Sequence, residues 1–373
     1  MKIAILHYWW VTNRGGEAVV KAITEIYPEA DLYLHVYDKA LLPKTLGEHF
    51  KGNIYTTFIA KLPGAAKHYQ KYLPLMPLAL EQLDLTSYDL IISSESGPAK
   101  GVITRPDALH ICYCHSPMRY VWDMYHDYLK GTGRLIRTLF PFIAHWLRVW
   151  DRASADRVDF FIANSTFVAS RIRKFYRRES EVVFPPVNVR SFNHARQRED
   201  FYLYLGQLVP YKRADLVVEA FNQLGLPLVV IGEGELYDAI KSKANSNIKV
   251  LGRQSFDVVK DHLERCRGLV FPGMEDFGIV PVEAMAAGAP VIAYKKGGAL
   301  DTVIDGKTGI FFAEQTEVSL KEAIMKIESG AVVFEPNFLR AHAERFEKSV
   351  FQKRLKSIID NKLQLIALNQ DVE

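Results

Sequence analysis

Short apolar runs that alternate with helix-length segments are the feature that most constrains the fold of this chain. The runs are residues 3–6, 90–93, 110–114, 160–163, 202–205, 228–231, 249–251, 269–271 and 291–293. Runs of this length, bounded by turn residues, are typical of buried strands, and parallel pairing requires connections of at least helix length between strands. The sequence therefore predicts an α/β fold of parallel sheets with helices on both faces.

A boundary between two domains is predicted near residue 186. The chain has 373 residues, enough for about two domains. The stretch F-P-P-V-N-V at residues 184–189 holds two prolines, a polar run follows at residues 193–200, and a new strand pattern begins at Phe201. We place an N-terminal domain at residues 1–186, a C-terminal domain at 187–345 and a charged helix at 346–373. Two doubly wound domains facing a central cleft would bind ligands where the carboxyl ends of their strands meet.

The composition narrows the functional classes. A chain with 49% hydrophobic and 24% charged residues is an ordinary globular protein, and a net charge of +4 is too small to indicate nucleic-acid binding. Cys112, Cys114 and Cys266 form no disulfide framework, and the first two alternate on a predicted strand, which favours packing over a metal site. The amino terminus lacks the pattern of a secretory signal, and no run of about 18 apolar residues is present. We expect a cytoplasmic protein.

Two motifs that follow predicted strands suit an anion. In N-R-G-G-E at residues 13–17, Gly15 and Gly16 permit close approach of a ligand to a helix end, although a simple tight turn explains them equally well. The motif is not G-x-G-x-x-G, which argues against a standard dinucleotide enzyme. In G-Q-L-V-P-Y-K-R at residues 206–213, Lys212 stands on a strand-to-helix loop and suits a phosphate oxygen. The alternative is a solvated Lys–Arg pair.

The stretch E-D-F-G-I-V-P-V-E at residues 275–283 places two carboxylates around a predicted helix start. Pro281 is best tolerated in a first helical turn, so we predict a loop at residues 275–279 and a helix at 281–287 that Gly288 ends. Glu275 then precedes the helix and Glu283 lies in its first turn. Backbone N–H groups of residues 276–280 would converge on the helix end and form an anion site. A capped core helix with an acidic first turn is the alternative.

From residue 201 to about residue 312, the order of motifs resembles the retaining nucleotide-sugar glycosyltransferases of family 4, which have the GT-B fold. The motifs are the glycine–lysine loop, the glycine turn V-V-I-G-E-G-E at residues 229–235, E-x7-E, a small-residue helix and G-G-x-x-D-x-V-x-D-G-x-T-G. The first domain is similar more loosely, through Gly15–Gly16 and C-H-S-P-M-R-Y-V-W-D at residues 114–123, which looks like bacterial mannosyltransferases of surface polysaccharide synthesis. The resemblance also implies that the last helix crosses back to the first domain.

The resemblance implies roles for individual residues. Glu283 would bind the ribose hydroxyls, Glu275 would face the donor sugar, and backbone N–H groups would hold the diphosphate. Gln207 stands where the family usually has arginine, so Lys212 would carry the charge, helped by Arg213 or Arg253. The implied donor-binding residues are Gly15, Gly16, Gly206, Lys212, Arg213, Arg253, Phe277, Gly278, Ile279 and Glu283.

The implied chemistry is transfer with retention, by attack on the leaving-group face and without an established enzymic nucleophile. Cations and helix-end amides aimed at the leaving diphosphate are the main source of catalysis. The implied catalytic residues are Glu275, His115 and Lys212. No metal is expected, since the chain lacks a D-x-D pair. His115 follows a predicted strand near the expected acceptor, where a buried core histidine is the alternative. The implied acceptor-side residues are Arg119, Tyr120, Trp122 and Asp123, for which a purely structural role is equally open.

Residues 134–152 form a predicted basic amphipathic helix. At about 100° per residue, Arg134, Arg137, His145, Arg148 and Arg152 fall within roughly 80°, and large apolar residues including three aromatic ones occupy the other side. Such a helix can lie on an anionic membrane surface. The alternative is a helix that packs its apolar face on the core.

The resemblance therefore implies a retaining glycosyltransferase that moves mannose from GDP-mannose to a lipid-linked glycan acceptor, and we expect it in the cytoplasm or on the inner face of the cytoplasmic membrane. A transferase that uses a UDP-hexose is the first alternative, and a non-catalytic protein that binds nucleotide sugars or glycans is the second.

Overall fold

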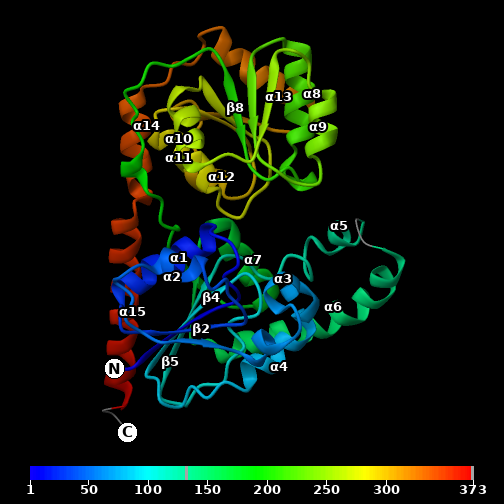
Figure 1. Ribbon diagram of the computed structural model, residues 1–373. Helices are drawn as coiled ribbons and strands as arrows, with labels where there is room; N and C mark the ends of the chain where they lie inside the picture. The colour runs from blue at the N-terminus through cyan, green and yellow to red at the C-terminus, as the bar shows by residue number, and fades with distance from the viewer. Residues whose placement is uncertain (131–132, 371–373) are drawn as a thin grey trace. The chain divides into compact units, whose positions relative to one another are not determined.

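The computed structural model describes residues 1–130 and 133–370, which divide into two compact units, each built on a parallel sheet (Figure 1). Unit 1 comprises Met1–Pro186 and the chain from Phe351 onward, and unit 2 comprises Val187–Val350. All strand pairs within the two sheets are parallel. The predicted class of two doubly wound α/β sheets is confirmed.

The sheet of unit 1 has the order β3-β2-β1-β4-β5-β6-β7. Its strands are β1 (Ile3–His7), β2 (Asp31–Leu34), β3 (Ile54–Thr56), β4 (Leu90–Glu95), β5 (Leu109–Cys114), β6 (Phe160–Ala163) and β7 (Ser180–Val182). Its helices are α1 (Gly15–Ile26), α2 (Leu41–Leu46), α3 (Ala65–His68), α4 (Met76–Glu81), α5 (Tyr125–Lys130), α6 (Arg134–Ser154), α7 (Thr166–Tyr176) and α15 (Lys348–Gln370). The strand order reverses between β1 and β4, and such a switch point is where doubly wound sheets bind ligands.

The last helix, α15, completes the core of unit 1. Phe351, Leu355 and Ile359 are buried in the same cluster as Ile5 of β1 and Val19 of α1. The aromatic ring of Phe351 lies 5.7 Å from that of Tyr113 in β5, and Gln352 donates a hydrogen bond to the carbonyl of Ala22 in α1. In Figure 1 the helix runs beside α1 and α2. The first unit is therefore made from the two ends of the chain.

The sheet of unit 2 has the order β10-β9-β8-β11-β12-β13, with a switch point between β8 and β11. Its strands are β8 (Tyr202–Leu205), β9 (Leu228–Ile231), β10 (Ile248–Gly252), β11 (Gly268–Phe271), β12 (Val291–Tyr294) and β13 (Gly309–Phe312). Its helices are α8 (Ala214–Leu224), α9 (Tyr237–Lys243), α10 (Phe256–Arg265), α11 (Ile279–Ala286), α12 (Ala299–Thr302), α13 (Glu317–Glu328) and α14 (Pro336–Ala343).

Each of the nine predicted apolar runs lies in a strand, but four further strands, β2, β3, β7 and β13, were not predicted. Three of the four are edge strands of their sheets. The residues of β3 and β7 are half-buried or exposed, so these strands lack the continuous apolar run that identifies a central strand. Strand β2 is buried but begins with Asp31, which interrupts the apolar pattern.

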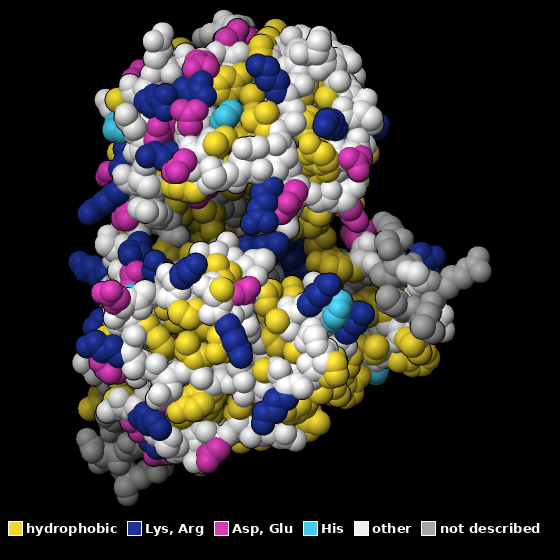
Figure 2. Space-filling view, in the orientation of Figure 1, with side chains coloured by type: hydrophobic (Ala, Val, Ile, Leu, Met, Phe, Trp, Pro, Cys, Tyr) yellow, Lys and Arg dark blue, Asp and Glu magenta, His cyan; other side chains and the backbone are white. Residues whose placement is uncertain are grey.

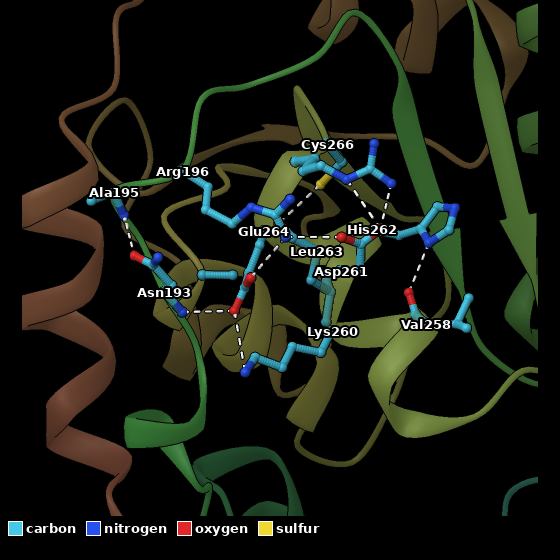
Figure 3. Close-up of polar contacts among 12 residues, drawn as sticks. Asn193, Ala195, Arg196, Val258, Lys260, Asp261, His262, Leu263, Glu264 and Cys266 are labelled. Atoms are coloured by element: carbon cyan, nitrogen blue, oxygen red, sulfur yellow. Dashed lines mark hydrogen bonds and ion pairs between the residues drawn. The ribbon is translucent and has the colours of Figure 1, made fainter.

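The polar run at residues 193–200 is fixed to α10 (Figure 3). Arg196 forms ion pairs with Asp261 at 2.8 Å and with Glu264 at 3.3 Å, and the backbone N–H of Asn193 donates to Glu264 at 2.8 Å. Arg198 donates to the carbonyl oxygens of residues at the end of the same helix. The charges of this run are therefore explained by pairing within unit 2, and the run does not behave as a solvated linker.

Candidate functional site

Two residues of the predicted site in unit 2 meet at the switch point of its sheet. Lys212 ends a short 3-10 turn (Pro210–Lys212) after β8, and Glu275 lies on the loop after β11. Lys212 Nζ lies 2.9 Å from Glu275 Oε1, and the two side chains are only 17% and 23% exposed. The loops that follow the two strands thus bring a lysine and a carboxylate into an ion pair, although they are far apart in the sequence.

Neighbouring loops hold this ion pair in place. The backbone N–H of Gly298, after β12, donates to the carbonyl of Glu275 at 2.9 Å. A Cβ atom on Gly298 would lie 2.3 Å from Cα of Phe277, so only glycine permits this contact. On the other side, the N–H of Leu208 in the lysine loop donates to the carbonyl of Glu233 in the glycine turn after β9. The glycine motifs of unit 2 therefore pack loops against one another.

Helix α11 begins earlier than predicted. Its first residue is Ile279, after Gly278 with a φ of +87°, so Ile279 is helical and Pro281 is the third residue of the helix. Glu283 consequently lies in the second turn, and its predicted place in the first turn is wrong. The reason is that a proline costs no hydrogen bond anywhere in a first turn, so Pro281 alone does not fix the start. Glu275 precedes the helix, as predicted.

The carboxyl group of Glu283 has no partner in the part of the chain that the structure describes. Burial raises the pKa of Glu283 from 4.5 to about 7. Within the described ranges, no hydrogen bond or ion pair is made by its carboxyl oxygens, although its side chain is half-buried. A carboxylate taken partly out of water without a partner is costly, and a ligand with hydroxyl donors would supply the missing hydrogen bonds.

The other predicted donor-binding residues of unit 2 occupy the same loops. Arg213, with a φ of +55°, immediately precedes α8, and its Nε lies 3.3 Å from Asp215 Oδ1. Arg253 follows β10, pairs with Glu233 at 3.2 Å and is 78% exposed. The N–H of Gly206 donates to the carbonyl of Ile231, and Phe277 is buried just before Gly278. Each arginine is thus paired with an acidic residue of unit 2.

Gly15 and Gly16 open α1, as predicted. The preceding Arg14 donates its N–H to Glu17 at 2.9 Å, which caps the helix start. A Cβ atom on Gly16 would lie 2.6 Å from the Tyr8 hydroxyl oxygen. The space that Gly16 leaves is therefore filled by a side chain of unit 1.

His115 belongs to a hydrogen-bonded chain at the switch point of unit 1. Ser94 Oγ lies 2.8 Å from His115 Nε2 and 3.1 Å from His7 Nδ1. Burial lowers the pKa of His115 to about 4, and burial together with the nearby His115 lowers the pKa of His7 well below 6.5, so both rings are neutral at neutral pH. The sequence prediction missed His7 and Ser94. Their position in the sequence could have indicated them, because each directly follows a predicted strand, and the carboxyl ends of neighbouring parallel strands lie close together.

The predicted acceptor-side residues are anchored within unit 1. Trp122 Nε1 donates to Asp151 of α6 at 2.7 Å, Asp123 forms an ion pair with Arg171 of α7, and the Tyr120 hydroxyl lies 2.9 Å from the sulfur of Met118. Arg119 is half-buried beside them. The loop is therefore fixed to two helices through the side chains that the motif contributes.

Asp151 also belongs to a closed buried charge cluster. Fully buried Lys100 forms ion pairs with Glu95, at 2.6 Å, and with Asp151. The Tyr176 hydroxyl donates to Asp151 as well. Burial would lower the pKa of Lys100, but attraction by Asp151 and Glu95 outweighs it and raises that pKa. The members of this cluster satisfy one another, which favours a structural role.

Helix α6 has one buried and one exposed apolar face. Ala144 and Leu147 pack against Met118 and Val121. The exposed stripe consists of Leu139, Phe142, Trp146 and Val149, of which Phe142 is 75% exposed. Figure 2 shows hydrophobic side chains gathered over α6, with Lys, Arg and His side chains over the adjoining α3.

The predicted basic face of α6 is not uniformly exposed. Arg148 donates to the carbonyl of Val121 at 2.6 Å, and Arg152 pairs with Asp156 at 2.8 Å. The guanidinium of Arg148 therefore satisfies a loop carbonyl of unit 1. The side chains of Arg134, Leu135 and Ile136 lie outside the described residues.

Two classes of feature are missing from the described part of the chain. No helix there has the length and apolarity needed to cross a membrane. No group of three or more His, Cys, Asp or Glu side chains there is arranged to hold a metal ion. Independence from metal ions stays a prediction.

Comparison with known proteins identifies the family. Residues 13–191 match the model of Glycosyltransferase Family 4, and residues 188–346 match that of Glycosyl transferases group 1. The chain is a glycosyltransferase in which a family 4 domain precedes a group 1 domain. This glycosyltransferase is 33% identical to an uncharacterized glycosyltransferase of Methanocaldococcus jannaschii, over 48% of its own length and 52% of the relative's. It is 25% identical to the alpha-1,3/1,6-mannosyltransferase ALG2 of Dictyostelium discoideum, over 64% of its own length and 67% of the relative's. The chain thus spans about half to two thirds of the length of these relatives.

A solved structure shares the fold of the glycosyltransferase. Anabaena HepE, crystallised in complex with UDP, aligns with 97% of this chain and 100% of its own at a TM-score of 0.67 and 18% identity. The GT-B fold that the sequence resemblance implies is therefore confirmed.

Proposed function

We propose that this glycosyltransferase is a retaining hexosyltransferase that moves mannose from GDP-mannose to a lipid-linked glycan acceptor in surface polysaccharide synthesis. The single observation that carries the proposal is the Lys212–Glu275 ion pair at the switch point of unit 2. The carboxyl of Glu283 on α11, which has no partner among the described residues, supports it. A cation for a leaving diphosphate and carboxylates for sugar hydroxyls are the groups that a nucleotide-sugar donor requires.

In this proposal unit 2 binds the donor. Glu283 accepts hydrogen bonds from the ribose hydroxyls, and the backbone at Phe277, Gly278 and Ile279 holds the diphosphate at the start of α11. Lys212 neutralises the charge that develops on the diphosphate as the sugar–phosphate bond breaks. Before the donor binds, Glu275 holds the Lys212 ammonium in position at 2.9 Å. Glu275 then faces the sugar.

Unit 1 would supply the acceptor side. His115 and the anchored loop with Arg119, Tyr120, Trp122 and Asp123 would contact the acceptor. The acceptor hydroxyl attacks from the face on which the diphosphate leaves, which retains the anomeric configuration, and no side chain is assigned as a nucleophile.

A membrane role is proposed for α6 and its neighbours. The exposed stripe of Leu139, Phe142, Trp146 and Val149 is apolar, and Lys67 and Lys71 lie on the adjoining segment of unit 1. Apolar side chains flanked by cations have the chemistry that binds an anionic bilayer surface, where a lipid-linked acceptor resides.

A UDP-hexose donor is the second candidate, because Anabaena HepE, which shares the fold, was crystallised in complex with UDP. A thermal-shift screen of GDP-mannose, UDP-glucose, GDP and UDP tests the choice, because a ligand at a hundred times its Kd stabilises the folded state by about 2.7 kcal/mol. We expect the largest shift with the GDP compounds, and mannose transfer to a lipid-linked acceptor. Shifts with UDP compounds alone would support the second candidate, and binding without turnover would support a non-catalytic protein.

A further inference from the structure

A chain of hydrogen bonds links His7, Ser94 and His115 across three adjacent strands of unit 1. His7 and Ser94 are register partners in β1 and β4, and His115 directly follows β5. Ser94 Oγ lies within hydrogen-bond distance of both rings, at 3.1 Å and 2.8 Å. Ser94 is fully buried and has no further side-chain partner among the described residues. Its hydroxyl group therefore donates its one hydrogen bond to one of the two imidazole rings.

A single hydroxyl proton leaves two proton arrangements. Each neutral imidazole has one N–H and one bare nitrogen. If Ser94 donates to His115 Nε2, it accepts from His7 Nδ1, and His115 carries its proton on Nδ1. If Ser94 instead donates to His7 Nδ1, it accepts from His115 Nε2, and His7 carries its proton on Nε2. The two outer nitrogens, His7 Nε2 and His115 Nδ1, consequently have opposite roles.

The surroundings of His7 favour one arrangement. His7 Nε2 is buried without a hydrogen-bond partner in the described part of the chain. Gly16 in the first turn of α1 lies against this ring, since a Cβ there would be 3.4 Å from His7 Cε1, and a helix start has a positive potential. The ring of Trp10, whose centroid is 5.8 Å away, carries only an N–H donor. Both neighbours favour a bare nitrogen at His7 Nε2.

We propose that His7 and Ser94 are positioning residues that hold His115 in the tautomer that donates from Nδ1. Within residues 1–130 and 133–370, His115 Nδ1 has no hydrogen-bond partner, and the side chain is only half-buried, so a ligand can reach this nitrogen. A protonated Nδ1 can donate to a hydroxyl or phosphate oxygen of a substrate, and it cannot accept a proton there. His115 is therefore a hydrogen-bond donor and not a general base. The identity of that substrate rests on the proposed function, whereas the tautomer does not.

Long-range ¹H–¹⁵N spectra of the full chain, labelled at histidine, test the tautomer directly. We expect a protonated Nδ1 and a bare Nε2 on His115, and a protonated Nδ1 on His7. Loss of one ring's signals in His115→Gln assigns the ring. A wild-type His115 protonated on Nε2 would overturn the proposal, and this measurement requires no variant to fold other than the one used for assignment.

Three serine variants test the positioning role. Ser94→Ala should let His115 adopt the other tautomer and lower kcat/KM about tenfold, the size expected for one lost hydrogen bond. Ser94→Thr keeps the hydroxyl and should restore both the His115 tautomer and kcat/KM. Ser93→Ala is the matched control, because Ser93 Oγ lies 2.9 Å from His110 Nε2 on the same two strands. It should change neither the His115 spectrum nor transfer.

The outcomes separate the two proposals. If His115 keeps its Nδ1 proton in Ser94→Ala, the positioning role is wrong, whatever the activity. If the spectra are as expected but no nucleotide sugar is turned over, the tautomer stands and the proposed function fails.

Discussion

At the switch point of unit 2 the chain places a charged pair, Lys212 and Glu275, whereas at that of unit 1 it places a neutral chain, His7, Ser94 and His115. Both sites follow from the same strand topology. They differ in charge: the unit 2 side chains form a partly exposed ion pair, whereas burial lowers the pKa values of the two unit 1 imidazoles and leaves both rings uncharged at neutral pH. Topology therefore fixes where these side chains converge, and the local surroundings decide whether the side chains form an ion pair or a neutral chain.

The largest expected effect is the loss of stability when the buried charge cluster of unit 1 is broken. Lys100→Ala would leave the carboxylates of Glu95 and Asp151 buried without their cation. Breaking a buried ion pair in this way costs about 3–5 kcal/mol, so the free energy of unfolding of unit 1 should fall by that amount in denaturant titrations. A Lys100→Ala variant as stable as wild type would contradict a structural role for this charge cluster.

The same substitution in unit 2 should affect rate and leave the fold intact. Lys212→Ala removes the cation proposed for the leaving diphosphate, and turnover should fall about a hundredfold, with a melting temperature close to wild type. Lys243→Ala, which removes an exposed lysine paired with Glu219, is the matched control and should transfer normally. Unchanged turnover in Lys212→Ala would refute the phosphate role.

Substitutions of Glu283 and Glu275 should have different effects, the first on nucleotide binding and the second on turnover. Glu283→Gln replaces the charged, two-oxygen acceptor proposed for the ribose by a neutral amide and should weaken nucleoside diphosphate binding by about tenfold or more in calorimetric titrations, since hydrogen bonds to charged groups contribute about 1.5–3 kcal/mol. Glu275→Gln should leave that affinity nearly unchanged and lower turnover. Equal nucleotide affinities in wild type and Glu283→Gln would exclude the ribose assignment.

The exposed aromatic residues of the two units should differ in membrane binding. Phe142→Ala combined with Trp146→Ala should lower binding to anionic vesicles about tenfold in flotation assays, because both side chains lose apolar contact with lipid. Phe256→Ala with Phe338→Ala removes two exposed aromatic side chains from unit 2 and should have no effect. Failure of wild type to bind anionic vesicles at low salt would remove the membrane role.

The smallest effect concerns stability and pH. Because the pKa of Glu283 is about 7 in the folded chain and 4.5 ordinarily, the unfolded chain releases this proton first as pH rises, and stability falls between pH 4.5 and 7. Glu283→Gln removes this loss. Its melting temperature should exceed that of wild type by a few degrees at pH 8 and match it at pH 4, whereas the exposed control Glu314→Gln should follow wild type throughout.

The central strands and the unit 2 motifs could be predicted because their signals are local. Apolar runs mark β4 and β5, and the spacing of Lys212, Glu275 and Glu283 lies within one recognisable order of motifs. The Lys212–Glu275 contact and the His7–Ser94–His115 chain depend on which strands are neighbours and in what register, which no local pattern contains. Arg148 shows the same limit, since its partner is a backbone carbonyl from another segment.

The return of α15 to unit 1 has a consequence for synthesis on the ribosome. Phe351, Leu355 and Ile359 complete the core of the unit that begins at Met1, so this core stays open until the whole of unit 2 has been made. Unit 2, whose strands are contiguous in sequence, can finish folding first, although it is translated second. The nascent first unit must meanwhile keep the apolar surface awaiting α15 away from other chains, which makes early termination after Val350 a route to aggregation.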